Sequence, residues 1–159
     1  MIVEGSDLRR VAGHFPTGVT VVTTTHDGRP CGLTVNSFAS VSLDPPLVLV
    51  CVSKAARAYA CVEAERTFVV NVLAEGQDRI ARVFASTAQD KFASVDHRRS
   101  PRGLPILDGV HAWLECDVVA RHAGGRTHTI YVGRVSALAT GSGRPLVFHG
   151  GRYTALAGG

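Results

Sequence analysis

The sequence contains very little lysine and few aromatic residues. Lys54 and Lys91 are its only lysines, and aromatic residues make up 6% of the chain. The net charge of +4 and the pI of about 9.2 are a mild basic bias, which suits a phosphate-bearing ligand but also an ordinary soluble protein. A barrel that binds nucleic acid needs clustered basic residues beside several surface aromatic side chains. Nucleic-acid binding is therefore the weakest candidate function.

Motifs for metal binding and for nucleophilic catalysis are missing. Cys31, Cys51, Cys61 and Cys116 form no C-x-x-C pair and have no nearby histidine at the spacing of a metal site. A G-x-S-x-G motif is absent, and GGRTHTIYVG lacks the G-x-G-x-x-G spacing of a dinucleotide-binding fold. Cys51 lies in an apolar run and Cys61 in a helical pattern, so we expect buried free thiols. These absences argue against a metal site, a hydrolase and a Rossmann fold.

Long apolar segments are missing as well. The N-terminal MIVEGSDLRR has no apolar signal core, and no window approaches the roughly 20 apolar residues of a membrane-spanning helix. The 159 residues are 45% hydrophobic and 19% charged, which is typical of a globular protein, and no linker or repeat divides them. We expect one cytoplasmic domain over residues 1–159, with reduced thiols and no membrane partner.

Apolar periodicity and turn residues predict a mainly β protein with two or three helices. Helices are expected over residues 6–13, 54–65 (capped by Ser53) and 76–86. Strands are expected in a hairpin over residues 18–35 that turns at Asp27-Gly28, and over residues 45–52, 67–73, 112–140 (turning at Gly124-Gly125) and 144–153. About seven short strands favour a mostly antiparallel, Greek-key-like barrel.

The stretch GLTVNSFASVSL, residues 32–43, carries more hydroxyl and amide groups than a core strand normally does. Strand alternation would place Leu33, Val35, Ser37, Ala39, Val41 and Leu43 on a face that suits the core. The opposite face would hold Thr34, Asn36, Phe38, Ser40 and Ser42. Small neutral hydrogen-bonding groups around one aromatic ring allow a flat polar ligand to lie against the strand. Satisfied hydroxyls on a solvated face are the alternative.

Seven segments together resemble the short-chain flavin reductase family, the reductase components of two-component flavin-dependent monooxygenases. The most specific is T-x-N-S-F-x-S-V-S-x-x-P-P-L, which begins at Thr34. In order, the segments are residues 15–24, 32–52, 68–77, 90–92, 114–119, 128–135 and 145–153. The resemblance spans Leu8 to Tyr153. It implies an FMN-binding split β-barrel, usually a homodimer that holds the flavin near the subunit interface.

The resemblance also implies which residues bind the flavin. Those that match the strand along the isoalloxazine ring and ribityl chain are Thr34, Asn36, Ser37, Phe38, Ala39 and Ser40. Those that match the next contacting segment and the phosphate region are Cys51, Val52, Ser53, Lys54 and Arg57. Those that match a region covering part of the flavin are Phe84, Lys91 and Phe92. Solvated surface cations, and core packing for Phe84, are the alternatives.

A histidine implied by the resemblance lies beside the nicotinamide ring, and His128 matches it. Many relatives carry Gly-Asp-His there, whereas this chain has Arg126, Thr127 and His128, and a purely structural histidine is the alternative. Tyr153 aligns with an aromatic residue on the nicotinamide side. Pro16, Thr17 and Gly18 occupy a matching turn.

The function implied is hydride transfer from NADH or NADPH to FMN or FAD, followed by release of reduced flavin to a partner monooxygenase. The cofactors carry the electronics of that reaction, so it needs no nucleophile–base pair. The alternatives are a reductase with another acceptor, a non-catalytic flavin carrier, and a pyridoxamine-phosphate-oxidase-like protein, against which the T-x-N-S-F motif argues.

Overall fold

The computed structural model of the protein describes residues 1–158. The helices are α1 (Gly5–Ala12), α2 (Tyr59–Glu65), α3 (Asp78–Ala85) and the 3₁₀ helix η1 (Lys91–Ser94). The first six strands are β1 (Thr17–Gly18), β2 (Thr20–His26), β3 (Arg29–Val35), β4 (Ala39–Leu43), β5 (Pro46–Ser53) and β6 (Thr67–Val72). The others are β7 (His97–Arg99), β8 (Pro105–Leu107), β9 (Ala112–Gly124), β10 (His128–Thr140), β11 (Leu146–His149) and β12 (Arg152–Ala155).

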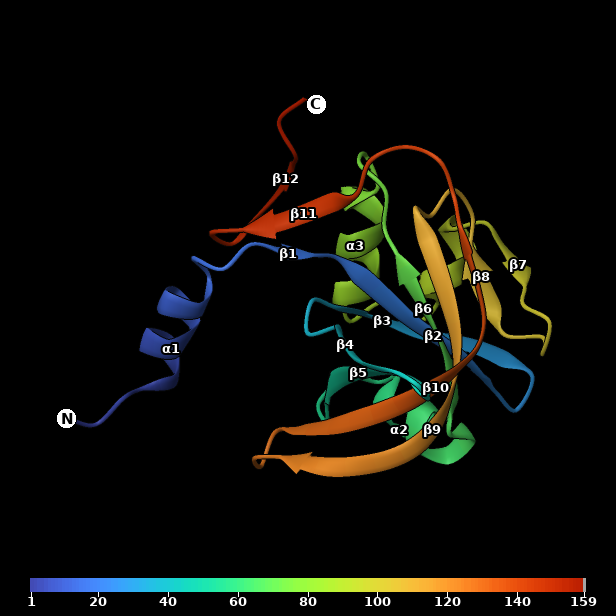
Figure 1. The fold of residues 1–159 in the computed structure, drawn as a ribbon, viewed down its shortest axis with the longest axis horizontal. Coiled ribbons are helices and arrows are strands. Elements are labelled where there is room, and N and C mark those ends of the chain that lie inside the picture. The colour runs from blue at the N-terminus through green and yellow to red at the C-terminus, as the bar shows by residue number, and fades with distance from the viewer. Residues whose placement is uncertain (159) are drawn as a thin grey trace.

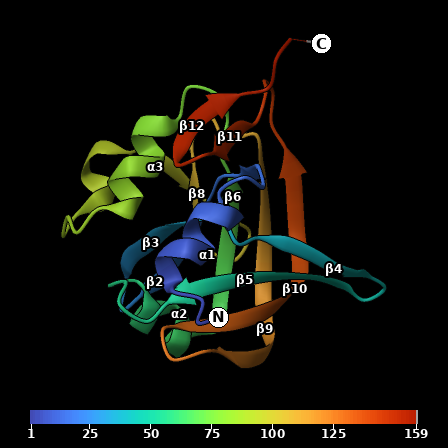
Figure 2. The same cartoon turned by 90° about the vertical axis from the view of Figure 1, so that its left-hand side faces the viewer.

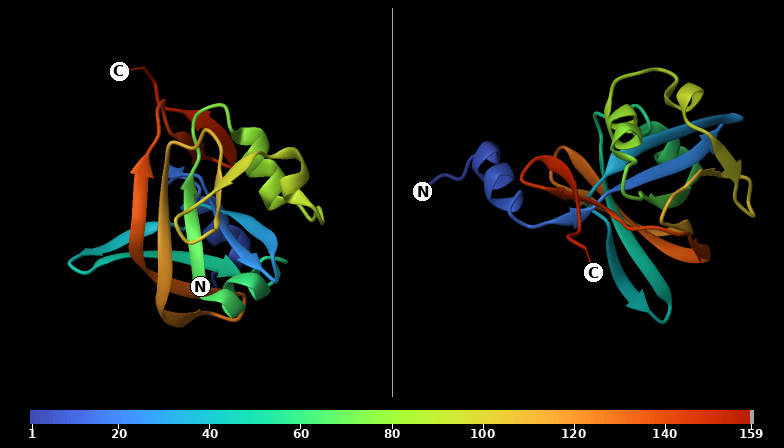
Figure 3. Two further views of the ribbon diagram at one scale, coloured as in Figure 1. Left: turned by 90° about the vertical axis from the view of Figure 1, so that its right-hand side faces the viewer. Right: turned by 90° about the horizontal axis from the view of Figure 1, so that it is seen from above.

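A seven-stranded sheet in the order β3-β2-β6-β9-β10-β5-β4 forms the body of the molecule (Figure 1). All of its neighbouring strands pair antiparallel, which confirms the predicted barrel architecture. A smaller sheet, β1-β11-β12, joins the two ends of the chain above it, and β7 and β8 form a separate hairpin. Two views show α1 and the tip of the β4–β5 hairpin projecting from the body (Figures 2 and 3).

The core lies on both faces of the sheet, because consecutive residues of one strand point to opposite sides. Val21 of β2 packs with Phe84 of α3 in one cluster, while its neighbour Val22 packs with Phe68 in the cluster beneath α2. Burying each such side chain contributes roughly 1.5–3 kcal/mol. The fully buried Asn71 amide donates to Val21 O at 3.0 Å and so ties β6 to β2.

Most of the predicted elements are confirmed. Positive φ angles of 49° at Asp27 and 73° at Gly28 make the tight turn between β2 and β3 that the Asp-Gly pair predicts. The first and third predicted helices correspond to α1 and α3. Among residues 1–158, no helix combines the length and apolar character that crossing a membrane requires.

The prediction of one continuous strand over residues 33–43 is wrong. β3 ends at Val35 and β4 begins at Ala39, so the alternation does not carry through the link between them. Val41 and Leu43, expected in the core, are 48% and 92% exposed. They belong to β4, an edge strand of the seven-stranded sheet that forms part of the projecting β4–β5 hairpin.

Two further predictions about local structure need correction. Ser53 does not cap a helix, because it ends β5 and α2 begins only at Tyr59; its hydroxyl instead accepts a hydrogen bond from Ala55 N–H at 3.3 Å. Residues 144–153 form two strands rather than one, joined at Gly150 and Gly151, whose φ angles are 59° and 76°.

The expectation of free thiols holds for only two of the four cysteines. Cys116 is buried, which raises the pKa of its thiol to about 12, and Cys51 is also free. Cys31 and Cys61, by contrast, form a disulfide between β3 and α2. The linear sequence separates these two cysteines by 30 residues, and only the packing of α2 beside β3 brings them together.

Candidate functional site

Two neighbouring pockets meet at Asn36, in the link between β3 and β4. The first, called here the Tyr153 pocket, is lined by Val19, Thr34, Asn36, Ala85, Phe148 and Tyr153. The second, called the Phe38 pocket, is lined by Phe15, Pro16, Thr17, Gly18, Thr20, Asn36, Phe38 and Val72. The exposed Asn36 side chain is therefore available to hydrogen-bond a ligand in either pocket. The predicted turn at Pro16 and the predicted strand residues thus come together.

Two of the predicted polar residues use their hydroxyls to hold this region in place. The Thr34 hydroxyl donates to Ala81 O at 2.6 Å, which joins β3 to α3. The Ser37 hydroxyl donates to Cys51 O and accepts from Cys51 N–H, both at 3.0 Å. Ser37 and Cys51 are therefore neighbours that fix the link against β5. Ala39 and Ser40 lie exposed at the start of β4.

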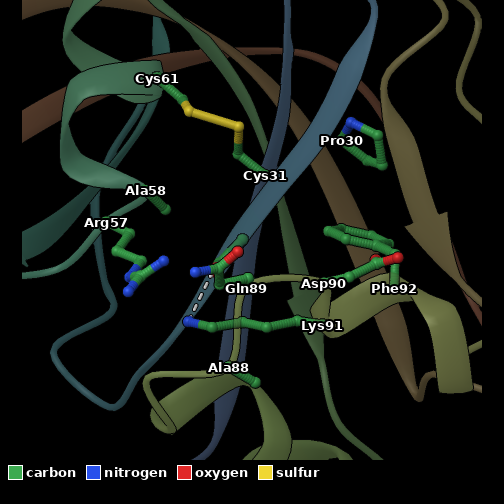
Figure 4. Close-up of a pocket in the computed structure, with 11 residues that line it drawn as sticks. Pro30, Cys31, Arg57, Ala58, Cys61, Ala88, Gln89, Asp90, Lys91 and Phe92 are labelled. Atoms are coloured by element: carbon green, nitrogen blue, oxygen red, sulfur yellow. Dashed lines mark hydrogen bonds between the residues drawn. A yellow bond between two sulfur atoms is a disulfide. The ribbon is translucent and has the colours of Figure 1, made fainter.

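A third pocket is basic. It lies between β3, the start of α2 and the residues that lead into η1. Arg57, Lys91 and Phe92 line it together with Gly32 and the disulfide, and it is called here the Lys91 pocket (Figure 4). The Lys91 ammonium donates to Phe84 O at 3.0 Å and to Gly32 O at 3.4 Å. Burial, and then the nearby charge of Arg57, lower the pKa of Lys91. The pocket is built to attract an anion.

Phe84 and Val52 are predicted site residues whose side chains lie in the core. Phe84 is 1% exposed and Val52 is fully buried. The Phe84 ring packs edge-on against Phe92 with their centroids 5.0 Å apart, and its carbonyl holds Lys91. Phe84 therefore supports the Lys91 pocket indirectly, through its contacts with Phe92 and Lys91.

His128 begins β10, directly opposite Ser53 of β5. The Thr127 hydroxyl lies 2.9 Å from His128 Nδ1, so Thr127 supplies a contact that orients the imidazole ring. Lys54 N–H donates to Thr127 O at 2.9 Å and holds the same turn. The turn between β9 and β10 lies at the opposite end of the molecule from β11 and β12 (Figures 1 and 2). One chain therefore does not bring His128 and Tyr153 together.

The family of the chain follows from comparison with known proteins. Residues 12–157 match the family described as flavin reductase like domain, which covers nearly the whole chain. The chain belongs to the flavin reductase family. Its fold is accordingly the split barrel of flavin reductases, as predicted.

Relatives of this flavin reductase include the reductase subunit of a flavin-dependent monooxygenase from Rhodococcus jostii. That protein is 46% identical over 155 residues, which cover 97% of this chain and 79% of the relative. An NADH-dependent FAD reductase from Streptomyces globisporus is 44% identical over 156 residues, covering 94% of this chain and 85% of the relative. A solved structure of a Streptomyces globisporus NADH:FAD oxidoreductase in complex with NAD and FAD fragments has a TM-score of 0.91 and 43% identity, covering 99% of this chain and 97% of that one.

Sequence reasoning missed the partners of Tyr153 in this flavin reductase. Phe148 lies opposite Tyr153 across the β11–β12 hairpin, with the ring centroids 5.3 Å apart. The Arg82 guanidinium carbon lies 5.1 Å from the Tyr153 ring centroid, and burial raises the pKa of the Tyr153 phenol. The Gly150-Gly151 pair was the available signal, because a hairpin turn there makes Phe148 and Tyr153 cross-strand partners.

Proposed function

We propose that the chain is an NAD(P)H-dependent flavin reductase that transfers hydride from a reduced nicotinamide to FMN or FAD and supplies reduced flavin to a partner monooxygenase. The observation that carries the proposal is the pair of pockets meeting at Asn36, lined by neutral polar groups and aromatic rings. A flat, uncharged ring system fits such a surface. The relatives named as monooxygenase reductases and as an NADH-dependent FAD reductase support the same function.

In the proposed arrangement, the isoalloxazine ring lies against residues 34–40 and the phosphate end of the flavin lies toward Arg57 and Lys91. Bound flavin supplies the hydride-accepting N5 atom, and the nicotinamide supplies the hydride. Asn36 and the backbone amides of the link hold the flavin ring, while Phe38 packs beside it. Neutral donors of this kind can stabilise the negative charge that develops on the reduced ring. Of the next predicted segment, Cys51 would act through its backbone, which holds the Ser37 hydroxyl, while Val52 supports the region from the core.

Anaerobic oxidation of NADH, and then of NADPH, by the purified protein with added FMN or FAD tests this function. Flavin bleaching and loss of nicotinamide absorbance are followed together. We expect catalytic turnover of free flavin. Flavin binding without turnover would instead favour the carrier alternative, and the absence of both would refute flavin chemistry altogether.

We further propose that residues 1–159 act as one domain in the cytoplasm. The single family match over residues 12–157 supports the first point. A requirement for reduced nicotinamide nucleotides supports the second, because the cytoplasm supplies them.

A homodimer would complete the site. His128 and Tyr153, both proposed for the nicotinamide side, lie at opposite ends of one chain, whereas a second copy can place one beside the other. The helix α1 buries none of its residues, and Leu8 and Val11 on one of its faces are 63% and 59% exposed. We infer that a second copy of the chain covers this face.

Replacing Leu8 and Val11 together by aspartate is expected to convert the dimer largely to monomer, because each charge would have to be buried in an apolar contact. Light scattering after size-exclusion chromatography measures the mass. Arg9→Asp, on the same helix but outside the hollow that Leu8 and Val11 line, is the control. A double variant that keeps the mass of the parent would refute this interface.

His128→Ala is expected to slow hydride transfer by about tenfold, because a misplaced nicotinamide spends less time in a reactive geometry. Flavin affinity should stay nearly normal, since His128 lies away from the pockets around Asn36. Stopped-flow anaerobic reduction measures the rate, and fluorescence titration measures the flavin Kd. Equal loss of both would mean that His128 is structural. Thr127→Val should produce the same effect in weaker form.

A further inference from the structure

The Cys31–Cys61 disulfide forms part of the wall of the Lys91 pocket. Cys31 comes from β3 and Cys61 from α2, and Figure 4 shows the sulfur–sulfur bond at one side of the hollow. Both cysteines are half-buried. Their bond is thus the covalent connection between two segments that enclose one pocket.

Each of the two connected segments holds one of the pocket's cations. Arg57 lies just before α2, four residues from Cys61. Lys91 is held by Gly32 O, next to Cys31 in β3. Figure 4 shows both side chains directed toward the same space.

The two cations repel each other, and the acidic residue of the pocket does little to offset this. Arg57 contributes to lowering the pKa of Lys91, which places the two charges within electrostatic reach. Asp90 also lines the pocket, but its carboxylate accepts a hydrogen bond from Ala93 N–H and caps η1. This repulsion favours separation of the two segments, and the disulfide opposes it.

We propose that Cys31 and Cys61 are a reversible redox modification site that sets the affinity of the Lys91 pocket for the phosphate group of the flavin. This inference rests on the proposed function. With the bond intact, Arg57 and Lys91 are held at the spacing of a preorganised anion site, and preorganisation raises affinity. Without it, the segment that carries Arg57 moves away from Lys91 and affinity falls.

The chemistry requires a dithiol reductant. One thiolate of the dithiol attacks a sulfur of the disulfide, forms a mixed disulfide and releases the other cysteine as a thiolate, which takes up a proton. The second thiol of the reductant then displaces the remaining cysteine, so the chain gains two electrons and two protons while the dithiol becomes a disulfide. In a cytosolic protein a disulfide is usually transient and catalytic or redox-sensing.

The test compares Kd values for FMN and riboflavin in the oxidised protein, in protein reduced by a dithiol, and in the Cys31→Ser/Cys61→Ser variant. We expect the Kd for FMN to rise about tenfold on loss of the bond, within the usual range of coupling between two sites. Riboflavin has the same ring but no phosphate, so its Kd should hardly change. Cys116→Ala, which removes a buried free thiol that lines none of the pockets described above, is the matched control, and circular dichroism verifies that each form is folded.

The outcomes separate the inference from the proposed function. An FMN affinity that does not depend on the redox state, or equal weakening of FMN and riboflavin, would overturn the inference and leave the reductase intact. Failure of the oxidised protein to bind any flavin would overturn both.

Linkage gives a second readout. If the bond strengthens FMN binding tenfold, FMN must make the disulfide harder to reduce by the same factor, a shift of about 30 mV for a two-electron couple. Thiol trapping in glutathione buffers, with and without FMN, measures that shift. The absence of any shift would contradict the inference.

Discussion

Replacement of Lys91 by methionine is expected to raise the Kd for FMN about 30-fold, the loss expected for a hydrogen bond to a charged group worth about 2 kcal/mol. Lys91 reaches the basic pocket with its ammonium already positioned by Phe84 O and Gly32 O, so little entropy is lost when it meets a phosphate. Methionine retains most of the apolar stem. Fluorescence titration with FMN and with riboflavin measures the effect, and riboflavin should bind the variant almost as it binds the parent.

The matched control uses the only other lysine of the chain. Lys54→Met removes the same charge from an exposed position on the segment that follows β5, outside the residues that line the Lys91 pocket. We expect a change of about threefold or less, because solvent screens exposed charges. Equal effects of the two substitutions would mean that net charge, and not the position of Lys91, governs FMN binding.

The same substitution should change the dependence of FMN affinity on pH. Burial and the charge of Arg57 lower the pKa of Lys91, so the ammonium loses its proton at a lower pH than an exposed lysine does. An anionic phosphate binds the protonated form, so FMN affinity falls as the pH rises through this pKa, well above the second phosphate pKa of about 6. The Lys91→Met variant should lack that alkaline step. Riboflavin controls for other groups that titrate in the same range.

Asn36→Leu is the second substitution for which we expect a large effect. Asn36 lines both the Tyr153 pocket and the Phe38 pocket, so its amide can hydrogen-bond a flavin ring bound in either of them. Leucine removes these hydrogen bonds and places an apolar group against polar ring atoms, which is expected to raise the Kd for FMN and riboflavin alike about 20-fold. Titration with both flavins distinguishes this effect from that of Lys91→Met.

Asn36 is exposed, so the substitution should leave the unfolding temperature nearly unchanged. Ser42→Leu is the control, because strand alternation had placed Ser42 on the same face, whereas it lies on the projecting β4–β5 hairpin. An unchanged flavin Kd for Asn36→Leu would refute the assignment of the flavin ring to this link.

Sequence patterns predicted the barrel and its local elements because those depend on near neighbours. The β2–β3 hairpin follows from Asp27-Gly28, and α3 follows from the apolar stripe that includes Ile80 and Phe84. Strand alternation singled out the polar residues around Asn36, and the resemblance to flavin reductases gave them a ligand. Of these residues, Thr34, Asn36 and Phe38 line the two adjoining pockets, whereas Ser37 is bonded to Cys51.

Features that depend on distant parts of the chain could not be predicted in this way. The break after Val35 arises because the chain passes from β3, at one edge of the seven-stranded sheet, to β4, at the other edge, and alternation alone cannot show where a strand ends. The Cys31–Cys61 disulfide requires α2 to pack beside β3, which no local pattern specifies. The separation of His128 from Tyr153 likewise depends on the order of strands in the sheet.

The pairing of β1 with β11 has a consequence for how the protein is made on the ribosome. Thr17, near the beginning of the chain, finds its partner Phe148 only when synthesis is almost complete. The strands from β2 to β10 pair only with one another, so every strand of the seven-stranded sheet has been synthesised before β11 is made. Phe148 and Tyr153, which line one side of the Tyr153 pocket, are added afterwards. A chain terminated early would therefore be a folded barrel with an open flank, and the ability to hold its ligand is acquired with the last strands.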